Sequence, residues 1–157
     1  MAVLRIGVLG AAGIAPQAII RPASRRDDVV IAAVASRREP SAIAYGQANA
    51  IPVVYGSYQA LLDDDSIELV YNALPPSEHA RWSIAALESG KHVLCEKPIA
   101  MNSAEAEEMA IVAARTGRRL IEAFHDRYHP LSLASTSWGS ENRASSVSLC
   151  RSTPPSP

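Results

Sequence analysis

Three short segments of this sequence place charged or very small residues where a binding cleft could use them. The segment EKP at 96–98 sets an acid, a base and a chain-stiffening proline directly after an apolar run. The segment GAAGIA at 10–15 follows another apolar run, and SRR at 36–38 follows a third. Charged groups at the end of a buried strand are typical of a strand that delivers them to a cleft.

The GAAGIA segment fits the relaxed spacing of a dinucleotide-binding turn, G-x-[GA]-x-x-[GA], through Gly10, Ala12 and Ala15. Small residues let the backbone approach a pyrophosphate, and a following helix presents free N–H groups to it. The spacing alone is a modest signal, because any turn between a strand and a helix can need a glycine. We interpret it as a dinucleotide turn because it follows a predicted strand and opens a predicted helix.

The residues after the second predicted strand bear on the choice of cofactor. A carboxylate there would accept a hydrogen bond from the ribose 2′-hydroxyl of NAD. This chain has Ser36, Arg37 and Arg38 instead, and an arginine fork beside a hydroxyl suits a 2′-phosphate. We therefore favour NADP over NAD. The alternative is a solvated arginine pair at the start of a helix, which is common.

The elements that would position these segments alternate regularly along the chain. Apolar runs of strand length are predicted at 3–9, 29–35, 53–55, 68–73, 92–96 and 119–123. Helical patterns lie between them, from the glycine turn to Ile20 and over 40–50, 58–64, 79–90 and 103–116. Ser57, Ser77 and Ser103 are expected to cap three of these helices, and Gly90 to end one.

Strand–helix alternation at this spacing predicts right-handed βαβ units and an α/β fold with a doubly wound parallel sheet. We expect six strands in the order 3-2-1-4-5-6 over residues 1 to about 125, with helices on both faces. Ligands bind beyond the carboxyl ends of the strands in such a sheet. Five segments are therefore expected at one edge: 10–15, 36–38, 73–79, 96–98 and 123–129.

Together these segments resemble the nucleotide-binding half of the Gfo/Idh/MocA oxidoreductases. The similarity runs from about residue 3 to residue 131, in the family's order and spacing. It is carried by GVLGAAGIA, AVASRREP, YGSYQALLDDDSIELVYNALPPSEHA, ALESGKHVLCEKPIAMN and EAFHDRYHP. The resemblance implies a Rossmann domain that binds NAD(P) for hydride transfer to or from a sugar, a polyol or a related carbonyl or alcohol.

The resemblance also implies roles for individual residues. Backbone around Gly10, Gly13 and Ile14 would meet the pyrophosphate. Glu96 would bind a ribose hydroxyl, and Lys97 would lie beside the nicotinamide, where its charge polarises the substrate oxygen. The ribose–nicotinamide side would be lined by Ala73, Leu74, Pro75 and His79. The alternative for the EKP segment is a charged strand end that merely faces solvent.

Composition argues against other classes of function. The 157-residue chain is 48% hydrophobic and 20% charged, with a net charge of −1, so we expect no nucleic-acid partner. No apolar run approaches membrane-spanning length, and we expect no membrane partner. The two cysteines form neither a metal motif nor a disulfide framework, which indicates the cytoplasm. Cys95 is expected to be a buried packing residue, and Tyr71 and Trp82 receive no function.

No metal is predicted, because no pair among the four histidines has a matching carboxylate at metal spacing. The sequence changes character after Leu131, with nine serines in the last twenty-six residues. We expect a nucleotide-binding domain at 1–130 and a largely disordered Ser/Pro-rich tail at 131–157. A shifted reading frame, a truncation and a natural tail are the alternatives.

Two functions compete at this point. One is an oxidoreductase whose present chain carries the cofactor half and Lys97 without the family's substrate domain. The other is a non-catalytic NADP-binding domain, either a relic or a dinucleotide sensor. The expected partners are a dinucleotide and, where a substrate domain is supplied, a small sugar or polyol; whether the chain forms a homo-oligomer stays open.

Overall fold

The computed structural model describes residues 3–124, which contain a six-stranded sheet. The strands are β1 (Leu4–Leu9), β2 (Val29–Ala35), β3 (Val53–Tyr55), β4 (Leu69–Asn72), β5 (His92–Glu96) and β6 (Leu120–Ala123). Neighbouring strands run parallel in the order β3-β2-β1-β4-β5-β6. The predicted doubly wound sheet and its strand order are confirmed.

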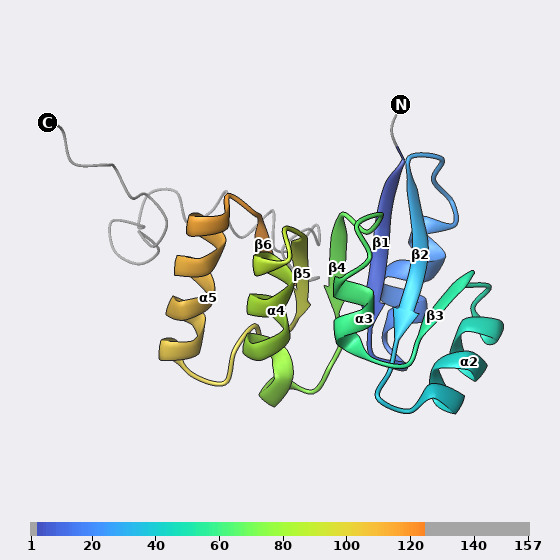
Figure 1. The fold of residues 1–157 in the computed structure, drawn as a ribbon, viewed down its shortest axis with the longest axis horizontal. Coiled ribbons are helices and arrows are strands. Elements are labelled where there is room, and N and C mark those ends of the chain that lie inside the picture. The colour runs from blue at the N-terminus through green and yellow to red at the C-terminus, as the bar shows by residue number, and fades with distance from the viewer. Residues whose placement is uncertain (1–2, 125–157) are drawn as a thin grey trace, which may run out of the picture. The chain divides into compact units, whose positions relative to one another are not determined.

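Helices cover both faces of this sheet (Figure 1). They are η1 (Pro16–Ile20, a π-helix), α1 (Arg21–Ala23), α2 (Glu39–Ala48), α3 (Tyr58–Leu62), η2 (Pro76–Glu78, a 3₁₀ turn), α4 (His79–Glu88) and α5 (Ser103–Thr116). None of them, in the described part of the chain, is both long and apolar enough to cross a membrane.

Two apolar clusters hold these layers together. One packs α3, α4 and α5 against the sheet through Leu61, Leu87 and Val112. The other packs η1 and α1 against the opposite face and includes Ile19 and Ile31. Strands with both faces covered must be apolar at successive positions, which explains why the last five residues of β2 are all buried.

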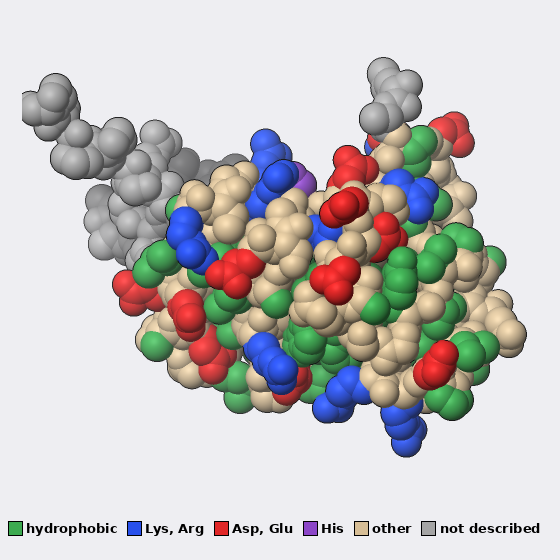
Figure 2. All heavy atoms as spheres, in the orientation of Figure 1, with side chains coloured by type: hydrophobic (Ala, Val, Ile, Leu, Met, Phe, Trp, Pro, Cys, Tyr) green, Lys and Arg blue, Asp and Glu red, His purple; other side chains and the backbone are tan. Residues whose placement is uncertain are grey.

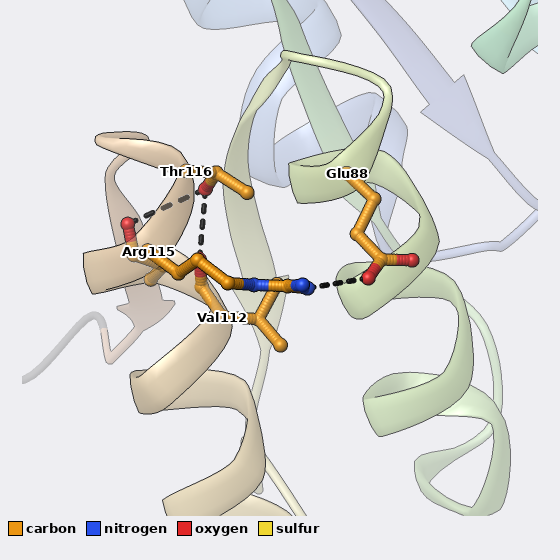
Figure 3. A network of polar contacts seen from close by, with 5 residues as sticks. Glu88, Val112, Arg115 and Thr116 are labelled. Carbon is orange, nitrogen blue, oxygen red and sulfur yellow. Dashed lines mark hydrogen bonds and ion pairs between the residues drawn. The ribbon is translucent and has the colours of Figure 1, made fainter.

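α4 and α5 pack beside each other, and polar contacts near their C-terminal ends are visible in Figure 3. Arg115 donates to Glu88 at 2.6 Å, and the Thr116 hydroxyl donates to the Val112 carbonyl at 2.9 Å. The two charged side chains are 62% and 52% exposed, so their ion pair contributes only about 0–1 kcal/mol. The helix pair therefore depends mainly on its apolar contacts.

The predicted caps Ser77 and Ser103 are wrong, although α4 and α5 begin at His79 and Ser103 as predicted. Ser77 lies inside η2, and α4 begins after Glu78 without a side-chain cap. The reason is the preceding proline pair, which starts a 3₁₀ turn in which the Glu78 N–H donates to the Pro75 carbonyl at 2.8 Å.

The first predicted helix also runs past Ile20 to Ala23, because Pro22 falls in the first turn of α1, where its missing N–H is tolerated.

At α5 the cap is Asn102 and not Ser103. The Asn102 side chain accepts from the Glu105 N–H at 2.9 Å, and the Glu105 carboxylate accepts from the Met101 N–H at 3.0 Å. This reciprocal arrangement resembles a capping box. The Ser57 cap of α3 is confirmed, since its hydroxyl accepts from the Ala60 N–H at 3.1 Å.

The predicted tail at 131–157 and most of the segment 123–129 lie outside the described residues.

The cap assignment yields a stability prediction. We expect Asn102→Ala to lower the free energy of unfolding by about 1 kcal/mol, because it leaves an N–H of the first turn of α5 without its partner. Ser103→Ala is the matched control and should change it by less than half as much. Urea unfolding followed by circular dichroism measures both values. Equal losses in the two variants would contradict the cap assignment.

Candidate functional site

The carboxyl ends of four strands lie side by side at the lower edge of the sheet in Figure 1. The register shows this directly: Leu9 of β1 pairs with Ala35 and with Asn72, and Asn72 pairs with Cys95 of β5. The predicted site segments after these strands are therefore neighbours. Figure 2 shows Lys and Arg side chains along the same lower edge.

The turn after β1 is shaped by Gly10. Its φ is +96°, and a Cβ there would lie 3.0 Å from the Leu74 Cδ2 and 3.3 Å from the Ala73 carbonyl oxygen, so only glycine fits. The Ala12 carbonyl accepts from the Tyr45 hydroxyl of α2 at 2.8 Å. The turn is thus held against the loop after β4 on one side and by α2 on the other.

A hollow of about 420 Å³ opens between this turn and the loop after β4. It is lined by Gly10, Ala11, Ala12, Tyr58, Ala73, Leu74 and Pro75. Because these side chains are mostly small, the backbone of the turn is accessible, as the close approach of a pyrophosphate requires. Gly13 and Ile14 are exposed and do not line this hollow.

A second hollow of about 320 Å³ shares Tyr58 with the first and reaches the end of β2. It is lined by Arg37, Gly56, Ser57, Tyr58, Gln59, Glu78, Arg81 and Trp82. Of the three residues predicted after β2, Arg37 alone lines it. The Ser36 hydroxyl instead accepts from the Arg38 N–H at 3.5 Å, at the start of α2.

The acid and the base at the end of β5 have different surroundings, because Glu96 is buried and Lys97 is exposed. Glu96 is 7% exposed and accepts from the Tyr71 hydroxyl and from the Lys97 N–H, the latter at 3.3 Å. Burial, followed by the bond to Glu96, raises the pKa of Tyr71 far above its ordinary value. Lys97 is exposed, and its ammonium has no hydrogen-bond partner among the described residues. The Glu96 carboxylate is thus fixed, whereas the Lys97 ammonium is available to a ligand.

The chain after Lys97 is held by a carboxylate of the next strand. Glu122 of β6 accepts from the Ile99 N–H at 2.9 Å, and the Lys97–Pro98 peptide bond is cis.

Cys95 is buried as expected, and burial raises the pKa of its thiol to about 12. This thiol is therefore unsuited to act as a nucleophile near neutral pH.

His79 lies beneath the loops and not on their surface. It is 1% exposed; its Nδ1 lies 2.8 Å from the Pro98 carbonyl oxygen and its Nε2 lies 2.7 Å from that of Leu74. The ring thereby connects the loops that follow β4 and β5. Direct contact with a ligand would require it to leave these two carbonyls.

Asn72 is a site residue that the sequence reasoning missed. It is fully buried, accepts from the Leu74 N–H at 3.3 Å and donates to the His79 carbonyl at 3.2 Å and to the Ser83 hydroxyl at 3.0 Å. The sequence feature that could have indicated Asn72 is its position as a polar residue at the end of the apolar run LVYN. Tyr71 and Trp82, which received no function, also contact site residues; the Trp82 indole N–H donates to Glu78 at 3.0 Å.

Within residues 3–124, no group of three His, Cys, Asp or Glu side chains is arranged to hold a metal ion.

Residues 4–124 match the family described as "Oxidoreductase family, NAD-binding Rossmann fold" (GFO_IDH_MocA). The chain is 44% identical over 128 residues to D-xylose 1-dehydrogenase (NADP(+)) 2 of Haloferax volcanii, covering 82% of this chain and 39% of that protein. It is 37% identical over 121 residues to trans-1,2-dihydrobenzene-1,2-diol dehydrogenase of Danio rerio, covering 77% and 36%. The chain therefore spans about two fifths of the length of these curated relatives.

A solved structure of a 3-ketoreductase from Actinomadura kijaniata, in complex with NADP and TDP-benzene, has the same fold over the matched region. Its TM-score is 0.80 at 34% sequence identity, and the match covers 88% of this chain and 42% of that one.

The contact between Tyr71 and Glu96 yields a prediction about pH. Because its pKa is raised, Tyr71 keeps its proton in the folded chain at a pH at which the unfolded chain loses it. The contribution of Tyr71 to the free energy of unfolding is therefore complete below about pH 10 and is lost as the pH rises above that value. We expect the urea midpoint to fall more steeply from pH 9 to 11.5 in the wild type than in Tyr71→Phe. Parallel slopes in the wild type and in Tyr71→Phe would contradict the assignment.

Proposed function

The chain belongs to the oxidoreductase family with the NAD-binding Rossmann fold, and from that premise we propose that it binds NADP along the carboxyl edge of its sheet. We propose further that Lys97 takes part there in hydride transfer to or from a sugar, a polyol or a related carbonyl or alcohol. The observation that carries the proposal is the pair of adjoining hollows, which leads from the Gly10 turn to Arg37.

The residues present fit a dinucleotide. The first hollow combines the Gly10 turn, which no larger residue could form, with small neighbours at Ala11 and Ala12. That combination suits a pyrophosphate. The second hollow adds the aromatic walls of Tyr58 and Trp82, which suit the flat apolar face of an adenine.

Arg37 is the basis for proposing NADP in preference to NAD. It is exposed, lines the second hollow and follows β2 where an NAD-binding chain would place a carboxylate. A guanidinium group attracts a 2′-phosphate and offers it a rigid pair of donors. The NADP in the name of the Haloferax volcanii relative and in the Actinomadura kijaniata complex supports this choice.

Lys97 is the proposed catalytic residue. Bound nicotinamide would supply or accept the hydride, and the reacting oxygen of the substrate would lose or gain negative charge in that step. An exposed ammonium at the end of β5 can stabilise this charge. Glu96 accepts from Tyr71 and is almost fully buried, so we propose that it orients the strand end. A hydrogen bond from a ribose hydroxyl to Glu96 would require its carboxylate to become accessible.

A sugar, a polyol or a related alcohol is the proposed substrate class, because the named relatives act on a sugar or on a cyclic diol. The second candidate function is NADP binding without turnover. It is favoured by the position of Lys97, which is exposed and lines neither hollow within residues 3–124.

Cofactor choice is tested by Arg37→Asp. We expect NADPH affinity to fall by about tenfold or more, because an attractive charged contact becomes a repulsion. NADH affinity should change by less than about twofold, because NADH lacks the 2′-phosphate. Calorimetric titration with both cofactors measures the two values. Equal losses would show that Arg37 does not contact the phosphate.

Turnover is tested on the purified 157-residue chain. We expect it to bind NADPH yet oxidise a panel of sugars and polyols with NADP slowly or not at all. Positioning a substrate at the nicotinamide can supply roughly 7–11 kcal/mol of barrier reduction, and an exposed Lys97 is screened by water. Rapid oxidation that Lys97→Ala abolishes would establish the first candidate function and exclude the second.

A further inference from the structure

The second hollow contains an arginine to which the proposed function gives no role. Arg81 comes from the first turn of α4, whereas Arg37 comes from the loop after β2, and both line the same space of about 320 Å³. Two guanidinium groups delivered to one hollow by separate elements suit a ligand with a concentrated negative charge. Such a group is a phosphate monoester.

Neighbouring side chains restrain the direction of Arg81. Its guanidinium carbon lies 5.0 Å from the centre of the Trp82 ring, and a terminal nitrogen lies 3.9 Å from the Glu78 Oε2. The Trp82 indole N–H donates to the same oxygen at 3.0 Å. The Trp82 ring is in turn packed edge-to-face on Tyr58, with centroids 4.9 Å apart. Arg81 is therefore oriented by a wall of the hollow.

These contacts leave Arg81 able to bind. Its side chain is 72% exposed, and an exposed ion pair at this separation is weak. Arginine has five N–H donors in a planar fork, and the hydrogen bonds of the described residues use none of those on Arg81. A phosphate carries more charge than a carboxylate and would compete well with Glu78 for this fork.

We propose that Arg81 is a second specificity-determining residue, which forms with Arg37 a two-arginine clamp for the 2′-phosphate of NADP; this rests on the proposed NADP-binding function. Glu78 has two opposed effects in this arrangement. It orients Arg81 through the shared contact with Trp82, and its negative charge disfavours the phosphate. The preference of the chain for NADP over NAD is thus set by two cations and one anion.

The test is calorimetric titration of the full chain with NADPH and NADH, and with 2′,5′-ADP and 5′-AMP. Arg81→Ala should weaken NADPH and 2′,5′-ADP about tenfold and the other two ligands less than about twofold. Arg81→Lys keeps the charge but loses the planar pair of donors, so its affinities for NADPH and 2′,5′-ADP should lie between those of the wild type and of Arg81→Ala. Glu78→Gln keeps an acceptor for Trp82 and removes the charge, so it should strengthen NADPH a few-fold and leave NADH unchanged.

Arg25→Ala is the matched control, because Arg25 is an exposed arginine before β2, at the opposite edge of the sheet. It should leave all four affinities within about twofold. The NADPH preference of the wild type should also shrink between about 50 and 300 mM salt, since screening weakens exposed charge contacts. Thermal melting of each variant checks that it folds.

Two results would overturn the clamp while leaving the proposed function intact. One is an NADPH preference that depends on Arg37 but is unchanged by Arg81→Ala. The other is an equal loss of NADPH and NADH in Arg81→Ala, which would make Arg81 part of the general adenosine pocket. A wild-type chain that binds neither cofactor would overturn the proposed function and the clamp together.

Discussion

The loops at the carboxyl edge leave the strand pairing after one further backbone hydrogen bond each, such as those from the Gly10 N–H to the Ala35 carbonyl and from the Ala73 N–H to the Leu9 carbonyl. Beyond these bonds, buried side chains from the strands and helices beneath supply partners for the backbone groups of the loops. An unpaired backbone group that is shielded from water is costly. His79 lies within hydrogen-bonding distance of two loop carbonyls, Asn72 accepts from the Leu74 N–H, and Tyr45 donates to Ala12. The shape of the ligand-facing edge depends on these contacts, because without them each loop would be free to adopt other conformations.

This constraint divides the polar residues of the site into two layers. His79, Asn72 and Tyr71 are almost fully buried and position backbone or other side chains. Arg37 and Lys97 are exposed and have their charged groups available to a ligand. The buried layer belongs to the strands and to α4, so the packing that stabilises the core also fixes the geometry of the site. A substitution in the buried layer should therefore alter stability and binding together, whereas one in the exposed layer should alter binding alone.

The positions of the strands were predictable because strand length, apolar content and glycine turns are local properties of the sequence, and their order was predictable from the right-handed βαβ connections of a doubly wound sheet. The strand predicted at 68–73 is observed at Leu69–Asn72, for example. Side-chain direction was less predictable. Spacing placed His79 at the correct edge but did not show that its ring turns inward. The contact between Tyr71 and Glu96 joins residues 25 positions apart, so it depends on the register of β4 against β5, which no local pattern specifies.

The charges at this edge are arranged asymmetrically. Three carboxylates are each held by a donor: Glu96 by Tyr71, Glu122 by the Ile99 N–H and Glu78 by Trp82. By contrast, the guanidinium of Arg37 and the ammonium of Lys97 are exposed. A carboxylate whose oxygen already accepts a hydrogen bond has less freedom to turn toward a neighbouring cation. Restraining the acids therefore keeps these two cations available, and an edge that carries both acidic and basic groups can still attract an anion.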